Sequence, residues 1–393
     1  MTSHQRSASS DDRSINKVLI AADKFKGSLT AAQVAARVTA GLAGGGFDGP
    51  VLSVPVADGG DGTVAAALAA GFDRAELRVD GPAGDQVTAA YALRGRTAVI
   101  EAAQACGLTL LPAGYRAPLT ATTRGVGQLI LAARTAGASQ IVLGVGGVAT
   151  TDGGAGMLQA LGARLADAAG RELPTGGGAL SRLAAVDLAG LPDLSGTEFL
   201  LASDVDNPLL GATGAAAVYG PQKGASAGDV RLLEAGLRRW ADLAEPAAAA
   251  TARYAPGAGA AGGLGFAALL FLGARMRPGI ELLLELASFG SRLDGAGLVI
   301  TGEGSLDAQT LHGKAPVGVA RAVAALDQAV PVVAVAGRCT LTAAQLAGAG
   351  IARAYALTEL ESDPSRCMAE AGPLLERLAE RIAADWLGAS RAR

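Results

Sequence analysis

Acidic residues recur in this chain directly after apolar, β-branched runs. The runs and the acids that follow them are KVLIAA with Asp23, VLSVPVA with Asp58 and Asp61, IVLGVGG with Asp152, FLLAS with Asp204 and Asp206, and LVIT with Glu303. In open α/β sheets, ligands bind outside the carboxyl ends of the strands. We therefore expect these side chains to gather around one active-site crevice, which indicates an enzyme.

The segment 58–62 reads DGGDG and precedes the helical pattern TVAAALAA. Carboxylate oxygens suit Mg²⁺, and a helix N-terminus suits phosphate. For this segment taken alone, a tight turn with an aspartate cap would be the commoner explanation. The repeated acids favour a cation site, because clustered like charges repel one another unless a cation or proton joins them. We predict Asp58, Asp61 and Asp206 as Mg²⁺ ligands.

Basic residues beside Gly or Ser provide matching cations. They are Lys24, Lys26, Arg124, Lys223 and Lys314. Glycines around Lys223 and Lys314 let the backbone approach a phosphate. Together with the acids, these cations describe phosphoryl transfer, in which a carboxylate orients or deprotonates the acceptor hydroxyl. Asp204 is the predicted base, and its neighbour Asn207 is expected to support the metal or the substrate.

Other functions are compatible with parts of the sequence. The P-loop motif for ATP is absent, since Gly313 and Lys314 are followed by Ala315. Residues 144–149 read GVGGVA after a strand-like run, and Asp167 follows about 20 residues later, as in NAD-dependent oxidoreductases. In that alternative, Asp152 stands where a pyrophosphate would have to approach. A ligand sensor is the non-enzymatic alternative, but no basic output module is visible.

Composition restricts the class of protein further. The chain has 393 residues, which favours about two domains, and it combines 50% hydrophobic residues with a net charge of −3. It lacks the basic surface of a nucleic-acid-binding protein and an apolar run long enough for a membrane span. Its three cysteines lie far apart, so we expect no disulfide or zinc site and a cytoplasmic location.

Strand-like runs alternate with helical patterns along the chain, which predicts an α/β fold with mainly parallel sheets. Thr30 and Gln33 have capping-box spacing at the start of the first helix, and glycines 44–46 are expected to end it. Residues 1–14 are polar and are predicted to form a disordered tail.

From about Lys17 to Leu387 the chain closely resembles the bacterial glycerate kinase family of the two-domain type that includes the glycerate 2-kinases. The resemblance is carried by DKFKGSL at 23–29, VPVADGGDGT at 54–63, TRG at 123–125, GVGGVATTDGGAG at 144–156, SDVDNP at 203–208, GPQKG at 220–224, PGAGAAGG at 256–263 and ITGEGSLDAQTLHGK at 300–314. It implies phosphorylation of D-glycerate with ATP and Mg²⁺, usually at the 2-hydroxyl, with the 3-hydroxyl as the alternative.

The resemblance also implies two α/β domains, one inserted in the other, with the active site in the cleft between them. We expect a discontinuous flavodoxin- or Rossmann-like domain at 15–66 plus 290–393 and an inserted domain at 67–289. The partners would be the small molecules D-glycerate and ATP, and a homo-oligomer is left open.

Matching the family's motifs to this chain gives the expected site. The catalytic residues are Asp204, Lys24, Lys223 and Lys314. The residues expected to bind substrate or phosphate are Asp23, Lys26, Ser28, Thr123, Arg124, Thr150, Asp152, Asn207, Gly302, Glu303 and Gly304. The family's usual GGSATND is GGVATTD here, so Val148 lacks a hydroxyl and Thr151 lacks an amide. If either position touches the substrate, efficiency or substrate preference could differ.

Overall fold

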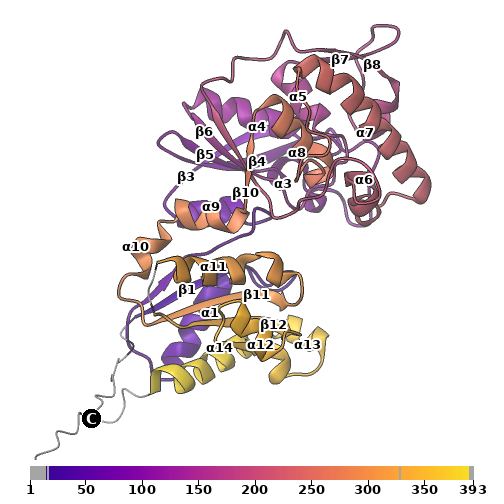
Figure 1. The fold of residues 1–393 in the computed structure, drawn as a ribbon. Helices are drawn as coiled ribbons and strands as arrows, with labels where there is room; N and C mark the ends of the chain where they lie inside the picture. Colours follow the sequence, from indigo (N-terminus) through magenta and orange to yellow (C-terminus); the bar gives the residue numbers. More distant parts are fainter. Residues whose placement is uncertain (1–14, 16, 327–328, 389–393) are drawn as a thin grey trace, which may run out of the picture. The chain divides into compact units, whose positions relative to one another are not determined.

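The chain forms two compact units in the computed structural model, which describes residues 15, 17–326 and 329–388. Unit 1 comprises Met1–Val54, Phe289–Leu311 and Val319–Arg393, and unit 2 comprises Pro55–Ser288 and His312–Gly318 (Figure 1). The predicted tail at 1–14 lies outside the described residues. The domain limits expected from the family resemblance stay a prediction.

Unit 1 is built on a five-stranded, fully parallel sheet with the order β13-β12-β11-β1-β2. The strands are β1 (Val18–Ala22), β2 (Val51–Ser53), β11 (Leu298–Leu306), β12 (Val332–Cys339) and β13 (Arg353–Ala356). In chain order this is the 2-1-3-4-5 arrangement of flavodoxin-like sheets, whose ligands bind at the switch point between the first and third strands. In unit 1 that point lies between β1 and β11.

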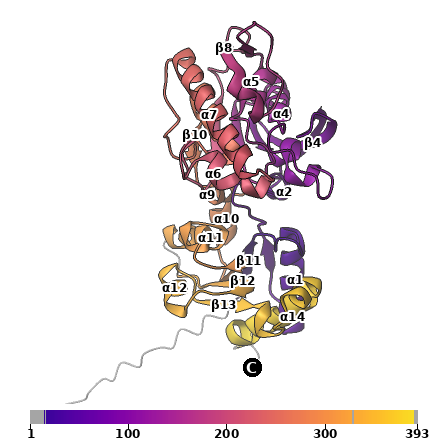
Figure 2. The ribbon, with the colours of Figure 1, turned by 90° about the vertical axis from the view of Figure 1, so that its right-hand side faces the viewer.

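One face of this sheet packs against helices α1 (Ala31–Gly44) and α14 (Ala371–Ile382), which lie side by side (Figure 2). Their packing is close, because a Cβ on Gly41 would lie 2.2 Å from the carbonyl oxygen of Glu376. The predicted capping box of α1 is present between Thr30 and Gln33, and the helix ends at the predicted glycines. The other helices that begin in unit 1 are α10 (Phe289–Leu293), α12 (Ala343–Gly348) and α13 (Pro364–Ala369).

β11 continues through Gly302, Glu303 and Gly304, beyond the apolar run LVIT that the sequence analysis took as the strand. Gly302 pairs with Val335 and Glu303 with Ala336 of β12. The glycine allows this continuation, because a Cβ on Gly302 would lie 2.4 Å from the carbonyl oxygen of Val335. The predicted site residues at 302–304 therefore lie on a strand.

Unit 2 contains a six-stranded mixed sheet with the order β10-β9-β6-β5-β4-β3. The strands are β3 (Asp73–Asp80), β4 (Gln86–Arg94), β5 (Thr97–Glu101), β6 (Gln140–Gly144), β9 (Glu198–Ala202) and β10 (Arg275–Arg277). The neighbours from β5 to β10 are parallel, whereas β3, β4 and β5 are antiparallel. A separate antiparallel pair joins β7 (Arg164–Asp167) and β8 (Leu183–Asp187).

Helices cover both faces of this sheet. One face packs against α4 (Arg124–Thr135), α5 (Ala155–Leu161), α7 (Ala227–Ala248) and α8 (Ala260–Phe271), and the other packs against α2 (Thr63–Ala69) and α9 (Gly279–Leu286). The remaining α-helices of unit 2 are α3 (Ala103–Cys106) and α6 (Ala215–Tyr219). Helix α11 (Ala315–Ala325) follows Lys314; its residues up to Gly318 belong to unit 2, and the rest of the helix belongs to unit 1. The predicted α/β class with mainly parallel sheets is confirmed. Within the described part of the chain, no helix is both long enough and apolar enough to cross a membrane.

Candidate functional site

The DGGDG segment lies across the carboxyl ends of the parallel strands in unit 2. Its Gly59 carbonyl accepts a hydrogen bond from the Gly146 amide, just after β6, at 3.2 Å. A Cβ on Gly59 would lie 2.5 Å from the carbonyl oxygen of Ala202, at the end of β9. A Cβ on Gly279, just after β10, would lie 2.2 Å from the carbonyl oxygen of Asp58. Glycines on both sides of these contacts allow the loop to approach the sheet edge this closely.

Asp204 reaches the same sheet edge from the end of β9. Its Oδ1 accepts a hydrogen bond from the Gly279 amide, the first residue of α9, at 3.1 Å. Part of Asp204 is exposed to solvent, but protein atoms surround the rest of the residue and exclude water from it. This desolvation raises the pKa of the Asp204 carboxyl to about 7, and the charges of Asp58 and Glu281 act in the same direction. A carboxylate with such a pKa suits a general base near neutral pH.

The predicted metal ligands do not form one cluster. Among the residues that the structure describes, no group of three or more His, Cys, Asp or Glu is arranged to hold a metal ion. The charge of Asp58 adds to the burial that raises the pKa of Asp204, whereas the charge of Asp206 adds to the burial that raises the pKa of the Tyr219 hydroxyl. Asn207 accepts a hydrogen bond from the Tyr219 hydroxyl at 2.6 Å and donates one to the Thr213 carbonyl at 2.8 Å. The metal-ligand role of Asp206 stays a prediction.

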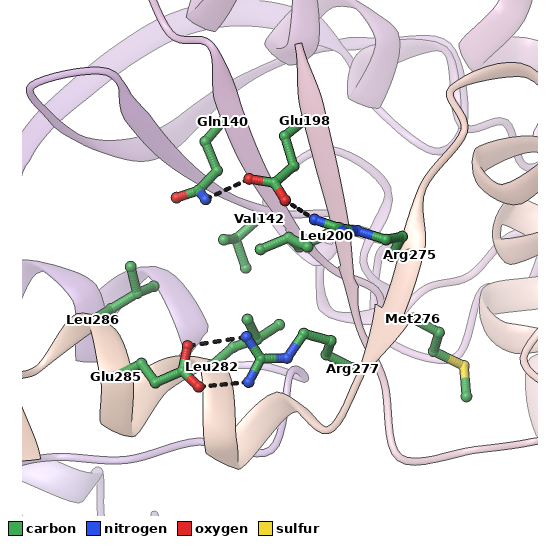
Figure 3. Close-up of a pocket in the computed structure, with 10 residues that line it drawn as sticks. All are labelled: Gln140, Val142, Glu198, Leu200, Arg275, Met276, Arg277, Leu282, Glu285 and Leu286. Atoms are coloured by element: carbon green, nitrogen blue, oxygen red, sulfur yellow. Dashed lines mark hydrogen bonds and ion pairs between the residues drawn. The ribbon is translucent and has the colours of Figure 1, made fainter.

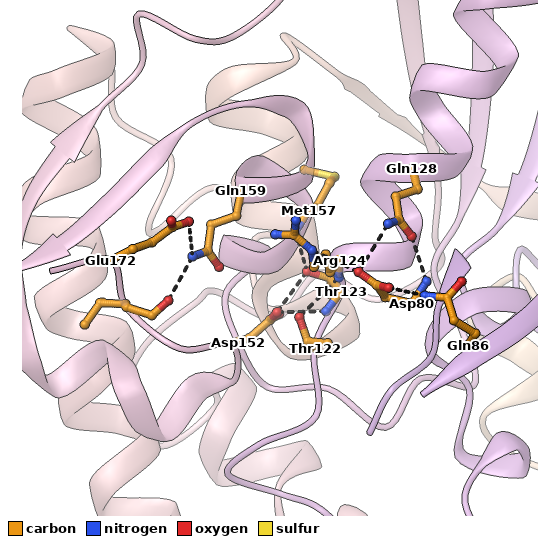
Figure 4. Close-up of polar contacts among 11 residues, drawn as sticks. Asp80, Gln86, Thr122, Thr123, Arg124, Gln128, Asp152, Met157, Gln159 and Glu172 are labelled. Atoms are coloured by element: carbon orange, nitrogen blue, oxygen red, sulfur yellow. Dashed lines mark hydrogen bonds and ion pairs between the residues drawn. The ribbon is translucent and has the colours of Figure 1, made fainter. Parts of the chain in front are cut away.

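Asp152 is the centre of a buried hydrogen-bond network (Figure 4). Its carboxylate, which is 0% exposed, accepts bonds from the Thr123 amide and hydroxyl at 2.8 and 2.9 Å. It also accepts bonds from the amides of Gly154 and Gly156 at 3.1 and 3.2 Å. Burial raises the pKa of Asp152, and these bonds oppose the rise. The carboxylate thereby ties the turn before α5 to the start of α4. Next to it, Arg124 forms an ion pair with Asp80 at 2.9 Å.

We expect Asp152→Ala to lower the free energy of unfolding by on the order of 3 kcal/mol, because it leaves several buried donors without an acceptor. Urea unfolding measures this change. Asp187→Ala is the matched control, since Asp187 is exposed and accepts one local bond, from the Ala189 amide. Unchanged stability combined with a loss of substrate affinity would instead make Asp152 a ligand contact.

Lys223 is buried, with 3% of the residue exposed. Its Nζ donates to the Thr150 carbonyl at 2.5 Å, and burial lowers the pKa of the amine to about 8. Near it, the hydroxyls of Thr150 and Thr151 are buried without a hydrogen-bond partner in the described structure. In this conformation Lys223 holds the segment after β6, and its contact with phosphate stays a prediction.

The two departures from the family pattern are both buried. Val148 is part of the large apolar core of unit 2, and Thr151 is completely enclosed. In this conformation neither side chain is accessible to a ligand from solvent.

The predicted residues of unit 1 gather at the switch point between β1 and β11. The Asp23 amide donates to the Gly302 carbonyl at 2.8 Å, and Gly304 lies against the backbone at Lys26. Lys24 lies 3.9 Å from the Asp23 carboxylate. Glu303 accepts a hydrogen bond from the Thr310 hydroxyl. These residues therefore lie where sheets of this order usually bind ligands, and their contacts with substrate or phosphate stay a prediction.

Two further predicted residues, Ser28 and Lys314, form hydrogen bonds with residues close to them in sequence. In unit 1, the Ser28 hydroxyl donates to the Phe25 carbonyl at 3.1 Å. In unit 2, Lys314 is half-buried and directly precedes α11, whose Gly318 amide donates to the Lys314 carbonyl at 3.0 Å. A lysine at a helix N-terminus adds its charge to the free amides that attract phosphate there.

Glu101, the last residue of β5, also lies at this sheet edge and was not predicted from the sequence. Its Oε2 accepts hydrogen bonds from the amides of Gly62 and Val64, in and just after the DGGDG segment, at 3.1 and 3.0 Å. Glu101 follows the run TAVI, so the rule that found the other acids would also have found it.

A cavity of about 390 Å³ lies elsewhere in unit 2, toward the amino-terminal ends of β6 and β9 (Figure 3). It is lined by Gln140, Val142, Glu198, Leu200, Arg275, Met276, Arg277, Leu282, Glu285 and Leu286. Its charged residues pair with one another, as Arg277 does with Glu285 at 2.9 Å. None of the predicted site residues lines this cavity.

Comparison with known proteins agrees with these motifs. The model of the Glycerate kinase family matches residues 18–387. A glycerate kinase of Bacillus subtilis is 45% identical over 94% of this chain and 97% of its own length. A glycerate 2-kinase of Escherichia coli K12 is 45% identical over 82% of this chain and 86% of its own length.

The fold leads to the same family. A crystal structure described as a candidate glycerate kinase 2 from Salmonella typhimurium LT2 superposes with a TM-score of 0.81 at 40% identity, covering 96% of this chain and 100% of that one. The predicted enzyme class, a kinase, is confirmed. The chain belongs to the glycerate kinase family.

Proposed function

We propose that this enzyme transfers the γ-phosphoryl group of ATP to the 2-hydroxyl of D-glycerate in a reaction that requires Mg²⁺. The observation that carries the proposal is Asp204, whose pKa is raised to about 7 and which stands with the DGGDG segment at one sheet edge. Support for the acceptor and its 2-hydroxyl comes from the relative in Escherichia coli, a glycerate 2-kinase.

In the proposed reaction Asp204 takes the proton of the 2-hydroxyl. The hydroxyl oxygen forms a bond to the γ-phosphorus, the bond to the β–γ bridging oxygen breaks, and ADP leaves. Lys314 and the N-terminus of α11, which follows it, would hold phosphate oxygens. We further propose that Lys24, Lys26 and Ser28 bind substrate or phosphate groups at the switch point of unit 1. The predicted domain limits are also part of this proposal.

The donors near Asp204 fit a magnesium ion. Mg²⁺ is usually held by one or two carboxylates together with substrate phosphates, so a protein cage of three ligands is not required. Asp58 and Asp61 provide such carboxylates, and the repulsion between Asp58 and Asp204 favours a cation. When bound, the ion would neutralise charge on the transferred phosphoryl group.

The glycine turn at 144–147 does not favour the oxidoreductase alternative. A Cβ on Gly146 would lie 2.4 Å from the backbone of Gly60, and one on Gly147 would lie 1.9 Å from the Asp61 carboxylate. The DGGDG segment of the chain therefore lies where a pyrophosphate would have to approach, and it brings a negative charge.

We expect ADP release only when ATP, D-glycerate and Mg²⁺ are all present, because the acidic edge needs a cation before phosphate can approach. A coupled ADP assay measures this. 3-Hydroxypropanoate, which lacks the 2-hydroxyl, is the matched control acceptor and should not react. Full activity in excess EDTA, or equal ADP release without an acceptor, would contradict the proposal.

A further inference from the structure

Glu101 is buried beneath the DGGDG segment, with 3% of the residue exposed. As the last residue of β5 it pairs with Gly144 of β6, which fixes its backbone at the sheet edge. One carboxylate oxygen accepts hydrogen bonds from the amides of Gly62 and Val64, and the other accepts one from the Gln104 side-chain amide at 3.4 Å. A buried carboxylate that binds backbone donors in this way restricts the segment that carries them.

Helix α2 has no side-chain cap of its own, and Glu101 provides an acceptor in its place. The N-cap residue is Gly62, at φ 98°, and it offers no side chain to the first amides of the helix. An oxygen acceptor on those amides normally comes from the N-cap side chain. Here it comes from β5, a strand that is distant in sequence.

The position of Asp61 follows from this arrangement. Asp61 precedes Gly62 directly, and its carboxylate lies so close to Gly147 that a side chain there would collide with it. The DGGDG segment contains three glycines and would otherwise be free to adopt many conformations. The hydrogen bonds to Glu101 and the close approach of Asp61 to Gly147 both restrict the segment.

We infer that Glu101 is a positioning residue, which orders the DGGDG segment so that Asp58 and Asp61 are held at the sheet edge. The inference rests on the proposed function only where its test measures kcat/KM on glycerate. It assigns Glu101 no contact with substrate.

The test compares Glu101→Ala with Glu101→Gln. Alanine removes the acceptor for both amides, so we expect kcat/KM to fall about 10- to 100-fold, as for other residues that orient a site. The Mg²⁺ concentration for half-maximal activity should rise. Glutamine keeps an oxygen in the same place, and Gln104 can rotate its amide to suit the new neighbour, so Glu101→Gln should stay within about threefold of wild type.

Hydrogen exchange of the ligand-free protein gives a readout that does not depend on activity. We expect faster exchange in the segment 58–66 of Glu101→Ala but not of Glu101→Gln. Glu245→Ala is the matched control. Glu245 is 7% exposed and its Oε1 also accepts two backbone amides, those of Ala252 and Arg253, both at 2.9 Å. This control should lower the melting temperature but leave kcat/KM per folded molecule and exchange at 58–66 unchanged.

Unaltered exchange at 58–66 in Glu101→Ala would overturn the inference. So would a loss of activity that only matches the loss of folded protein, as in Glu245→Ala. A wild-type protein without activity on glycerate would contradict the proposed function instead, and the exchange measurement would still decide the role of Glu101.

Discussion

Replacing Asp204 with Asn is expected to lower turnover by about 10²- to 10⁴-fold while ATP affinity stays nearly unchanged. Asn can keep the hydrogen bond from the Gly279 amide, since its carbonyl oxygen can replace Oδ1. It cannot take a proton from the acceptor. Steady-state kinetics against Mg²⁺ concentration, together with a direct ATP-binding measurement, tests the prediction.

Alternative roles for Asp204 predict different results. If Asp204 were mainly a metal ligand, extra Mg²⁺ would partly restore turnover of Asp204→Asn. If its role were structural, the melting temperature would fall and all functions would decrease together. Normal turnover would remove Asp204 from the reaction.

The pH dependence follows from the same carboxyl. Its pKa in the folded protein is about 7, against an ordinary value of 3.8, so wild-type kcat/KM should decline as the pH falls below about 7. Between these values the folded protein binds more protons at Asp204 than the unfolded chain does. The stability that Asp204 contributes is therefore present below about pH 4 and is lost as the pH rises through 7. The melting temperature of Asp204→Asn, relative to that of the wild type, should therefore increase as the pH rises from 5 to 8.

Replacing Lys314 with Ala is expected to lower turnover by about 10²- to 10³-fold, by analogy with the loss of one preorganised donor to a developing negative charge. The half-buried lysine at the start of α11 would lose its charge, while the helix keeps its backbone amides. The matched control is Lys17→Ala, because the Lys17 Nζ donates to the carbonyls of Arg292 and Asp294, both at 2.7 Å, in a structural contact. Its turnover should stay near wild type. Wild-type turnover and ATP affinity in Lys314→Ala would make Lys314 an ordinary surface lysine.

Much of the fold could be predicted because local signals agreed with the final packing. The capping box at Thr30 and the alternation of apolar runs with helical patterns both reappear in the structure. The antiparallel pair β3 and β4 was not predicted, since half of the residues of β3 are exposed and the strand lacks a long apolar run. The extension of β11 was missed because glycines usually indicate a turn, and close pairing with β12 overrides that preference here.

The sequence predicted where the candidate site lies better than it predicted which contacts its side chains make. Asp204 lies at a strand end as expected, because sheet topology brings the carboxyl ends of parallel strands to one edge. The burial of Lys223 could not be predicted, since lysine is usually exposed and its partner, the Thr150 carbonyl, carries no sequence signal. The four hydrogen bonds of Asp152 likewise depend on tertiary packing between α4 and α5.

The proton-coupled phosphorus NMR spectrum of the reaction product shows whether the enzyme phosphorylates the 2-hydroxyl of D-glycerate, as proposed. Carbon 2 of glycerate carries one hydrogen and carbon 3 carries two. Incubation with ATP, Mg²⁺ and D-glycerate should give a new phosphate-ester signal split into a doublet, the pattern of 2-phosphoglycerate. A triplet would show transfer to the 3-hydroxyl, and the absence of any new ester signal from folded, ATP-binding protein would contradict glycerate as the acceptor.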